Sequence, residues 1–161
     1  MTKLIGIMFI SLATGAWGFE YASMLKCRLR SLEAILRLIE SLTSKISAFL
    51  TPTGEFFDSY CDEYLEECGF LKHLREKKSF SDALRLCADA LFLNDGDISL
   101  LCEFADGLGA ISAEQEVKRC NYYKNKCAER LSEAKTELPL RSRLYKSIGF
   151  MSALLAAVLV L

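Results

Sequence analysis

The sequence LKCRLRSLEAILRLIESLTSKISAFL, residues 25–50, decides the fold class of this chain. Its large aliphatic residues recur at spacings of three or four, the period of one face of an α-helix. They are Leu25, Leu29, Leu32, Leu36, Ile39, Leu42, Ile46 and Leu50. No glycine or proline interrupts the run before Thr51-Pro52, a pair typical of a helix end. We therefore predict a long amphipathic helix that ends near Phe49.

Shorter helices are expected to follow. The sequence GEFFDSYCDEYLEEC, residues 54–68, places aromatic side chains on one helical face and precedes Gly69, a suitable C-terminal cap. A turn over FLKHLREK follows. Ser79 and Asp82 then have the spacing of a capping box that opens the next helix.

The second half of the polar middle contains similar signals for helix starts and ends. Asp97 is expected to cap a helix that ends at Gly107 and Gly109. Ser112 and Gln115 form a second capping-box pattern, which opens the longest remaining helical run.

Pro139 is expected to kink or break that last helix. No strand-like alternation competes anywhere in the sequence. We predict an all-α fold, an antiparallel helical bundle whose first and last helices are long.

Both ends of the chain are apolar. LIGIMFISLATGAWGF, residues 4–19, is uncharged and would span about 24 Å as a helix, close to the thickness of a bilayer core. Residues 144–161 would span about 27 Å, with Tyr145 as an interfacial aromatic residue. We predict an N-terminal transmembrane helix over 1–24, a cytoplasmic helical bundle over 25–143 and a C-terminal transmembrane helix over 144–161.

Two other interpretations of the ends remain open. The first segment could be a cleaved signal peptide, because Lys3 supplies a positive start and Thr14-Gly15-Ala16 is an acceptable cleavage site. Either end could instead be a buried core helix. The free cysteines and the second apolar end argue against export.

The flanking charges predict the orientation. Basic residues follow the first apolar segment and precede the last one, whereas only Lys3 lies outside. They are Lys26, Arg28, Arg30, Lys135, Arg141, Arg143 and Lys146. Both flanks therefore place the middle of the chain on the cytoplasmic side of a membrane.

Small residues recur in both apolar segments at spacings that let membrane helices approach closely. They are Ser11, Gly15, Gly18 and Ala22 in the first segment and Gly149, Ala153 and Ala157 in the last. We expect these positions to pack against each other or against a partner's helices, although small residues are also simply common in membrane spans.

The composition excludes several classes of function. The net charge is -1, so no basic field favours nucleic acid. The 7 cysteines are an odd number without close pairs, which indicates free thiols in a reducing compartment rather than a disulfide framework.

No arrangement of residues suggests chemistry. The single histidine, His73, lies among charged residues, and the sequence has no phosphate-binding P-loop. Cys61 and Cys68, like Cys120 and Cys127, are about 10.5 Å apart along a helix, too far for one zinc ion. We predict no catalytic, cofactor-binding or metal-binding residue and no small-molecule substrate, and therefore a non-enzymatic protein.

Several segments, taken in order, resemble the stage III sporulation protein AB family. They are KLIGIMFISLATGAWGF leading into RLRSLEAILRLIESLTSKI, then TPTGEFFDSY, SFSDAL, FADGLGAISAEQ and RLYKSIGFMSALLAAVLVL. The near matches in the last two segments are Leu108, Gly109, Ser112, Gln115, Tyr145, Ser147 and Gly149. The resemblance covers nearly the whole chain, although Pro139 and the many cysteines depart from the family's pattern.

The resemblance implies a role in endospore formation. The family is similar to the cytoplasmic helical domain of type II secretion inner-membrane platform proteins and is encoded with a secretion-type ATPase. It implies a place on the mother-cell side of the outer forespore membrane, where the chain would couple that cytosolic ATPase to a channel-like assembly.

One corner of the predicted bundle is a candidate docking surface. A glycine-ended helix that meets a capped one makes a rigid turn with a free helix N-terminus. The residues are Leu108, Gly109, Ser112, Glu114, Gln115 and Glu116, with both glutamates expected to be exposed. Alternatively, this turn only fixes the bundle fold, and valine at Gly109 would disrupt it in either case.

Three classes of function therefore remain, in decreasing order of support. The first is a membrane-anchored scaffold that couples an ATPase to other membrane components of a sporulation complex. The second is a secreted or soluble α-helical binding protein with a cleaved N-terminal signal. The third is an enzyme with a cysteine nucleophile.

Overall fold

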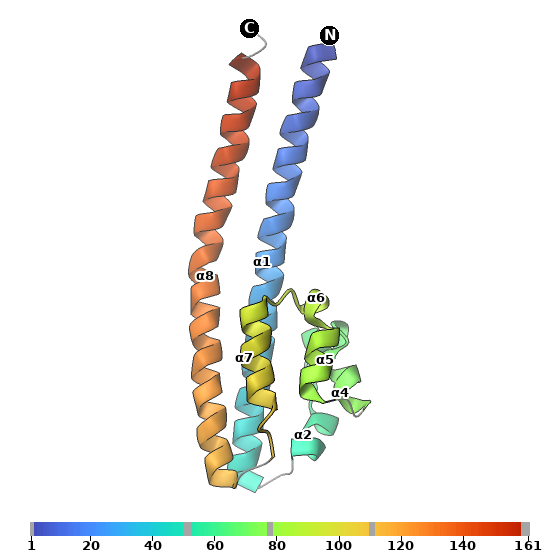
Figure 1. The fold of residues 1–161 in the computed structure, drawn as a ribbon, viewed down its shortest axis with the longest axis vertical. Helices are drawn as coiled ribbons and strands as arrows, with labels where there is room; N and C mark the ends of the chain where they lie inside the picture. Colours follow the sequence, from blue (N-terminus) through green and yellow to red (C-terminus); the bar gives the residue numbers. More distant parts are fainter. Residues whose placement is uncertain (1, 50–52, 77–78, 110–111, 159–161) are drawn as a thin grey trace. The chain divides into compact units, whose positions relative to one another are not determined.

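The computed structural model describes residues 2–49, 53–76, 79–109 and 112–158, whose regular secondary structure is all helical, with no strand among them (Figure 1). The helices are α1 (Thr2–Phe49), α2 (Thr53–Ser59), α3 (Glu63–Glu67), α4 (Phe70–Arg75), α5 (Phe80–Leu86), α6 (Ala88–Leu91), α7 (Asp95–Ala105) and α8 (Ala113–Val158). The predicted all-α class is confirmed.

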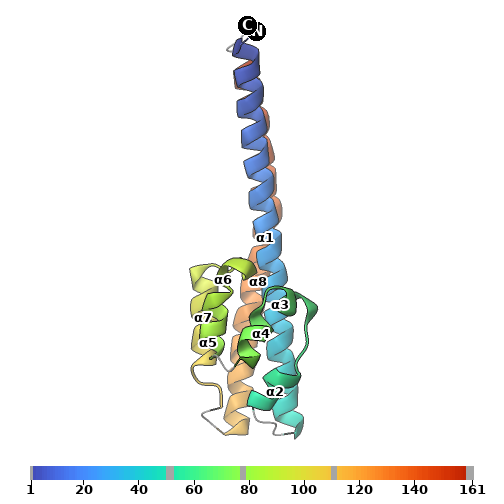
Figure 2. The same cartoon turned by 90° about the vertical axis from the view of Figure 1, so that its right-hand side faces the viewer.

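The chain divides into two units by its contacts. Unit 1 comprises Met1–Lys26 and Glu133–Leu161, and unit 2 comprises Cys27–Ser132. Within unit 1 the start of α1 and the end of α8 run antiparallel (Figures 1 and 2). The division does not test the predicted membrane boundaries.

The apolar face of α1 contributes to the core of unit 2, and the prediction from its spacing is confirmed in part. Leu32, Ile39, Leu42 and Ile46 of the predicted stripe are buried, whereas Leu36 is only half-buried. Ile35 and Leu38, which lie outside that stripe, are fully buried as well. Burial of one such side chain contributes about 1.5–3 kcal/mol, so this face supplies a large part of the folding free energy. The end of α1 at Phe49 also agrees with the prediction from Thr51-Pro52.

Aromatic side chains connect the short helices of unit 2. Phe80 on α5 contacts Phe57, Phe70 and Phe104, whose ring centroids lie 5.9, 5.2 and 6.0 Å away. Phe104 on α7 in turn contacts Tyr123 on α8 at 5.4 Å. These edge and tilted contacts are the favoured geometries of aromatic pairs, and they join α2, α4, α5, α7 and α8 into one core.

The helix predicted over residues 54–68 is wrong in one respect, because the structure divides it into α2 and α3. Asp62 adopts an extended conformation and its side chain accepts a hydrogen bond from the Leu65 amide, which caps α3. The same carboxylate pairs with Arg37 on α1 at 2.9 Å. A cap and a tertiary ion pair therefore outweigh local helix propensity. Gly69, with φ of 77°, ends α3 as predicted.

The boundaries and caps of α4, α5 and α7 agree only in part with the predictions. Ser79 caps α5 by accepting from the Asp82 amide, which confirms the predicted start. The predicted FLKHLREK turn is largely the short helix α4. Asp97 does not take the N-cap position of α7: Asn94 is the N-cap, and Asp97, at position N3, completes the capping box with it.

The break expected at Pro139 is wrong, because α8 continues through it. Proline removes one amide donor and crowds the carbonyl four residues earlier, which usually bends or breaks a helix. Pro139 is exposed, so water can satisfy that carbonyl without a break.

Within the described part of the chain, no helix is both long enough and apolar enough to cross a membrane. The predicted membrane-packing residues lie in α1 and α8, but their side chains fall outside the described residues. They are Ser11, Gly15, Gly18, Ala22, Gly149, Ala153 and Ala157.

Candidate functional site

The predicted docking corner lies between α7 and α8. Helix α7 ends at Ala105, and α8 begins at Ala113, which puts Ser112 at the predicted N-cap position. Gly109 has φ of 80°, a left-handed conformation that favours glycine, so valine there would be strained. Residues 110–111 lie outside the described residues.

Several side chains of this corner reach solvent. Ser112, Glu114 and Gln115 are exposed, and Leu108 is half-buried. Glu114 forms an ion pair with Lys118 one turn later on α8, at 2.8 Å, and both side chains are largely exposed. An exposed pair of this kind contributes little stability and exchanges readily for a partner's charges.

Arg119 holds the two helices of the corner together. Its Nη2 donates to the carbonyl oxygens of Glu103 and Phe104, the last turn of α7, at 2.7 Å each. These carbonyls have no amide donor of their own at a helix end, and a cation suits the negative end of the helix dipole. The guanidinium fills the space where a side chain at Gly107 would lie, 1.3 Å from a Cβ at that position.

Glu116 does not belong to the accessible surface, contrary to our expectation. Its side chain is buried, and its two carboxylate oxygens have no hydrogen-bond partner among the described residues. It lies in the first turn of α8, where the positive end of the helix dipole stabilises an anion. Burial, followed by the Glu116 charge, raises the pKa of the Cys120 thiol one turn later.

A sequence signal for the burial of Glu116 does exist. Helix α8 buries Glu116, Cys120, Tyr123, Cys127 and Leu131, at spacings of three and four. Glu116 therefore opens the apolar stripe of α8, and its place on that stripe predicts burial. The charge of the residue, taken alone, predicts exposure instead.

The buried ion pair between Arg28 and Asp97 was also missed. Arg28 on α1 donates from Nε to Oδ2 of Asp97 at 2.7 Å and from Nη2 to Oδ1 at 3.1 Å. Asp97 is fully buried, and Arg28 is almost so. The pair joins residues 69 positions apart, so it fixes α7 against α1 rather than offering a surface to a partner.

The comparisons with known proteins identify the family. The sequence model described as stage III sporulation protein AB matches residues 3–161. This chain belongs to the stage III sporulation protein AB family. No curated protein and no solved structure matches it.

Two buried thiols of this family member, Cys120 and Cys127, are poor candidates for a nucleophile. Burial raises the pKa of Cys127 to about 12 and also raises the pKa of Cys120. A raised pKa disfavours the thiolate, which is the reactive form. His73 is half-exposed and lies 3.3 Å from Glu76. Among the described residues, no group of histidine, cysteine and acidic side chains could hold a metal ion.

Proposed function

We propose that this member of the stage III sporulation protein AB family is a non-enzymatic, membrane-anchored scaffold. Its two apolar ends cross the outer forespore membrane, and its helical bundle faces the mother-cell cytoplasm. The bundle couples a cytosolic secretion-type ATPase to the other membrane components of a channel assembly. It uses no cofactor, nucleic acid or small-molecule substrate.

The observation that carries this proposal is the family match over residues 3–161, which assigns the chain to stage III of sporulation. Two further features support a two-pass arrangement. The start of α1 and the end of α8 run antiparallel within unit 1, as the two spans of a hairpin would (Figure 1). The basic residues beside both apolar segments favour a cytoplasmic middle.

The ATPase docks, in this proposal, at the exposed part of the corner between α7 and α8. Ser112, Glu114 and Gln115 are accessible there, at the start of a helix that Arg119 ties to the end of α7. A preformed surface lowers the entropic cost of association, which makes the start of a helix fastened to its neighbour a better docking site than a mobile loop.

The test is charge reversal at this corner with a matched control. Glu114→Lys is compared with Glu129→Lys, because each glutamate is exposed on α8 and pairs with a neighbouring lysine, at 2.8 and 3.0 Å. Tagged full-length chains are purified from membranes of sporulating cells, and the recovered ATPase is quantified. We expect Glu114→Lys to lose most of the ATPase and Glu129→Lys to retain it, with unchanged helical content in both. Full recovery with Glu114→Lys would exclude docking at this corner.

The second candidate function is a secreted or soluble helical binding protein with a cleaved N-terminus. It is favoured only by the signal-peptide pattern around Lys3 and Ala16. N-terminal sequencing of the mature chain decides between the two. Loss of the first sixteen or so residues would rule out the two-pass scaffold.

A further inference from the structure

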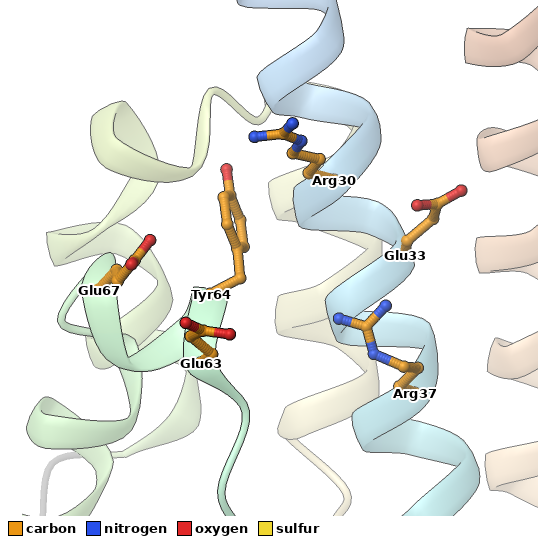
Figure 3. A pocket seen from close by; sticks show the side chains of 6 residues that line it. All are labelled: Arg30, Glu33, Arg37, Glu63, Tyr64 and Glu67. Atoms are coloured by element: carbon orange, nitrogen blue, oxygen red, sulfur yellow. The ribbon is translucent and has the colours of Figure 1, made fainter.

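A groove with an unusual lining lies between α1 and α3 in unit 2 (Figure 3). It has a volume of about 320 Å³ and is open to solvent. Its lining residues are Arg30, Glu33, Arg37, Glu63, Tyr64 and Glu67. Small-molecule sites are mostly apolar and enclosed with a few polar groups, whereas five of these six residues are charged. The groove therefore favours the charged side chains of a protein.

Two charged walls face each other across the groove. Arg30, Glu33 and Arg37 come from α1, and Glu63, Tyr64 and Glu67 come from α3 (Figure 3). Glu33 already has an interaction partner. Arg37 is already paired with Asp62 at 2.9 Å. Arg30, Glu63 and Glu67 have no ion pair with any residue that the structure describes. One free positive charge and two free negative charges therefore remain for a partner.

The groove is preformed, because Tyr64 on its α3 wall is tied to the buried core. The Tyr64 hydroxyl lies 3.1 Å from Ser31 Oγ and donates to the Cys27 carbonyl oxygen at 3.3 Å. Ser31 is fully buried and donates to the carbonyl of Leu91. Leu65, next to Tyr64, is also fully buried. The walls are therefore held in place without a ligand, which favours recognition.

The spacing of the charges indicates the shape of the partner. Glu63 and Glu67 are one helical turn apart, the spacing at which two lysines or arginines also stand on one face of a helix. Arg30 on the opposite wall requires an acidic side chain. The volume admits a few side chains but not a whole helix. A partner helix would thus lie across the groove and insert its side chains.

We propose that this groove is a second docking surface, distinct from the corner between α7 and α8, and that it receives a helix of a partner protein carrying two basic residues one turn apart and a nearby acidic residue. The basic residues meet Glu63 and Glu67, and the acidic residue meets Arg30. This surface is independent of the proposed ATPase site, since no residue is shared.

The test uses a defined probe. An alanine-based helical peptide of about 20 residues carries two lysines four positions apart and one glutamate two turns away. Its binding to the full chain in detergent micelles is measured by fluorescence anisotropy at low salt. We expect the double variant Glu63→Gln, Glu67→Gln to weaken binding roughly tenfold, and Arg30→Gln to weaken it severalfold. Glu40→Gln, an exposed control on α1 outside the groove, should bind like the unaltered chain.

Matched peptides identify which charges meet. A peptide with glutamines in place of its lysines should bind the unaltered chain as weakly as the parent peptide binds the double variant, and combining both changes should cost nothing further. Additive losses, or equal binding by all variants, would overturn the proposal. Two other results would also overturn the proposal. One is displacement of the peptide by phosphatidylethanolamine vesicles that bind the chain as tightly as the peptide does. The other is a dimer of the chain that Arg30→Gln dissociates, because the groove would then be an interface between two copies.

Discussion

At the scale of single residues, two carboxylates are buried inside the bundle and are therefore not available to bind a partner. Asp97 and Glu116 both lie in the first turn of a helix, on a stripe of buried residues. Asp97 pairs with the guanidinium of Arg28, whereas the carboxylate of Glu116 has no hydrogen-bond partner among the residues that the structure describes. Because an uncompensated buried charge is costly, removal of either member of the Arg28–Asp97 pair should be far more harmful than loss of an exposed pair.

Asp97→Asn should therefore destabilise the bundle by about 3 kcal/mol, because it leaves Arg28 nearly buried beside a neutral amide. Urea unfolding of the full chain in micelles, followed by circular dichroism, measures the effect. The exposed Asp95→Asn serves as the control and should change stability by less than about 0.5 kcal/mol. Equal effects of the two substitutions would show that the buried pair does not stabilise the fold.

Cys127 makes the unfolding free energy of the bundle depend on pH in the alkaline range. Burial raises the pKa of its thiol to about 12 in the folded chain, and Sγ donates to the Leu32 carbonyl oxygen at 3.8 Å. The folded chain thus holds a proton that the unfolded chain releases at lower pH. The stabilisation is complete below the ordinary thiol pKa and is lost as the pH rises toward 12.

The unfolding free energy should therefore fall between about pH 8.5 and 10.5, and Cys127→Ala should make that fall shallower. The Cys127→Ala chain will be less stable at every pH because it leaves a cavity, so the slope rather than the absolute value is the readout. Cys61→Ala, at an exposed thiol, should keep the original slope. An unchanged slope in Cys127→Ala would contradict the assignment.

At the scale of elements, sequence spacing predicted the helices well where local signals dominate. The stripe of α1, its end near Thr51-Pro52 and the Ser79 cap all follow from neighbouring residues. Partners distant in sequence decide the features that were missed. Asp62 breaks a predicted helix while pairing with Arg37, 25 positions away, and Asp97 pairs with Arg28, 69 positions away. Periodicity along one helix cannot reveal which residue of another helix lies opposite.

The joint between α7 and α8 provides the element-scale prediction. Gly107→Ala places a Cβ 1.3 Å from the Arg119 guanidinium, which must leave the carbonyls of Glu103 and Phe104. We expect a loss of about 1–2 kcal/mol in unfolding free energy. Arg119→Gln should cost a similar amount, and the double variant little more than either alone, because both remove the same hydrogen bonds.

Gly96→Ala is the matched control for this prediction. It lies in α7, and its added Cβ would meet Asn94 Oδ1 at an ordinary 3.5 Å. Alanine is the better helix former, so this change should stabilise the chain by about 0.5 kcal/mol. A Gly107→Ala chain as stable as the Gly96→Ala chain would show that Arg119 does not fasten the joint.

At the scale of the whole molecule, the chain combines a charged middle with two apolar ends. The exposed surface of the charged middle includes the corner between α7 and α8 and the groove between α1 and α3. Aromatic contacts pack its core. A scaffold requires this separation, because residues that bind partners must differ from residues that stabilise the fold. The family match assigns the chain to sporulation, and the two-pass membrane arrangement is the part of the account on which the scaffold role rests.

Labelling of Cys61 tests that arrangement most directly, because Cys61 is exposed in unit 2 and reports the side on which the bundle lies. Carbonate-washed vesicles of both orientations are treated with a membrane-impermeant maleimide. The account predicts that the full-length chain stays in the membrane pellet and that Cys61 is labelled only in inside-out vesicles. Release of the intact chain by carbonate, or labelling of Cys61 in right-side-out vesicles, would contradict it.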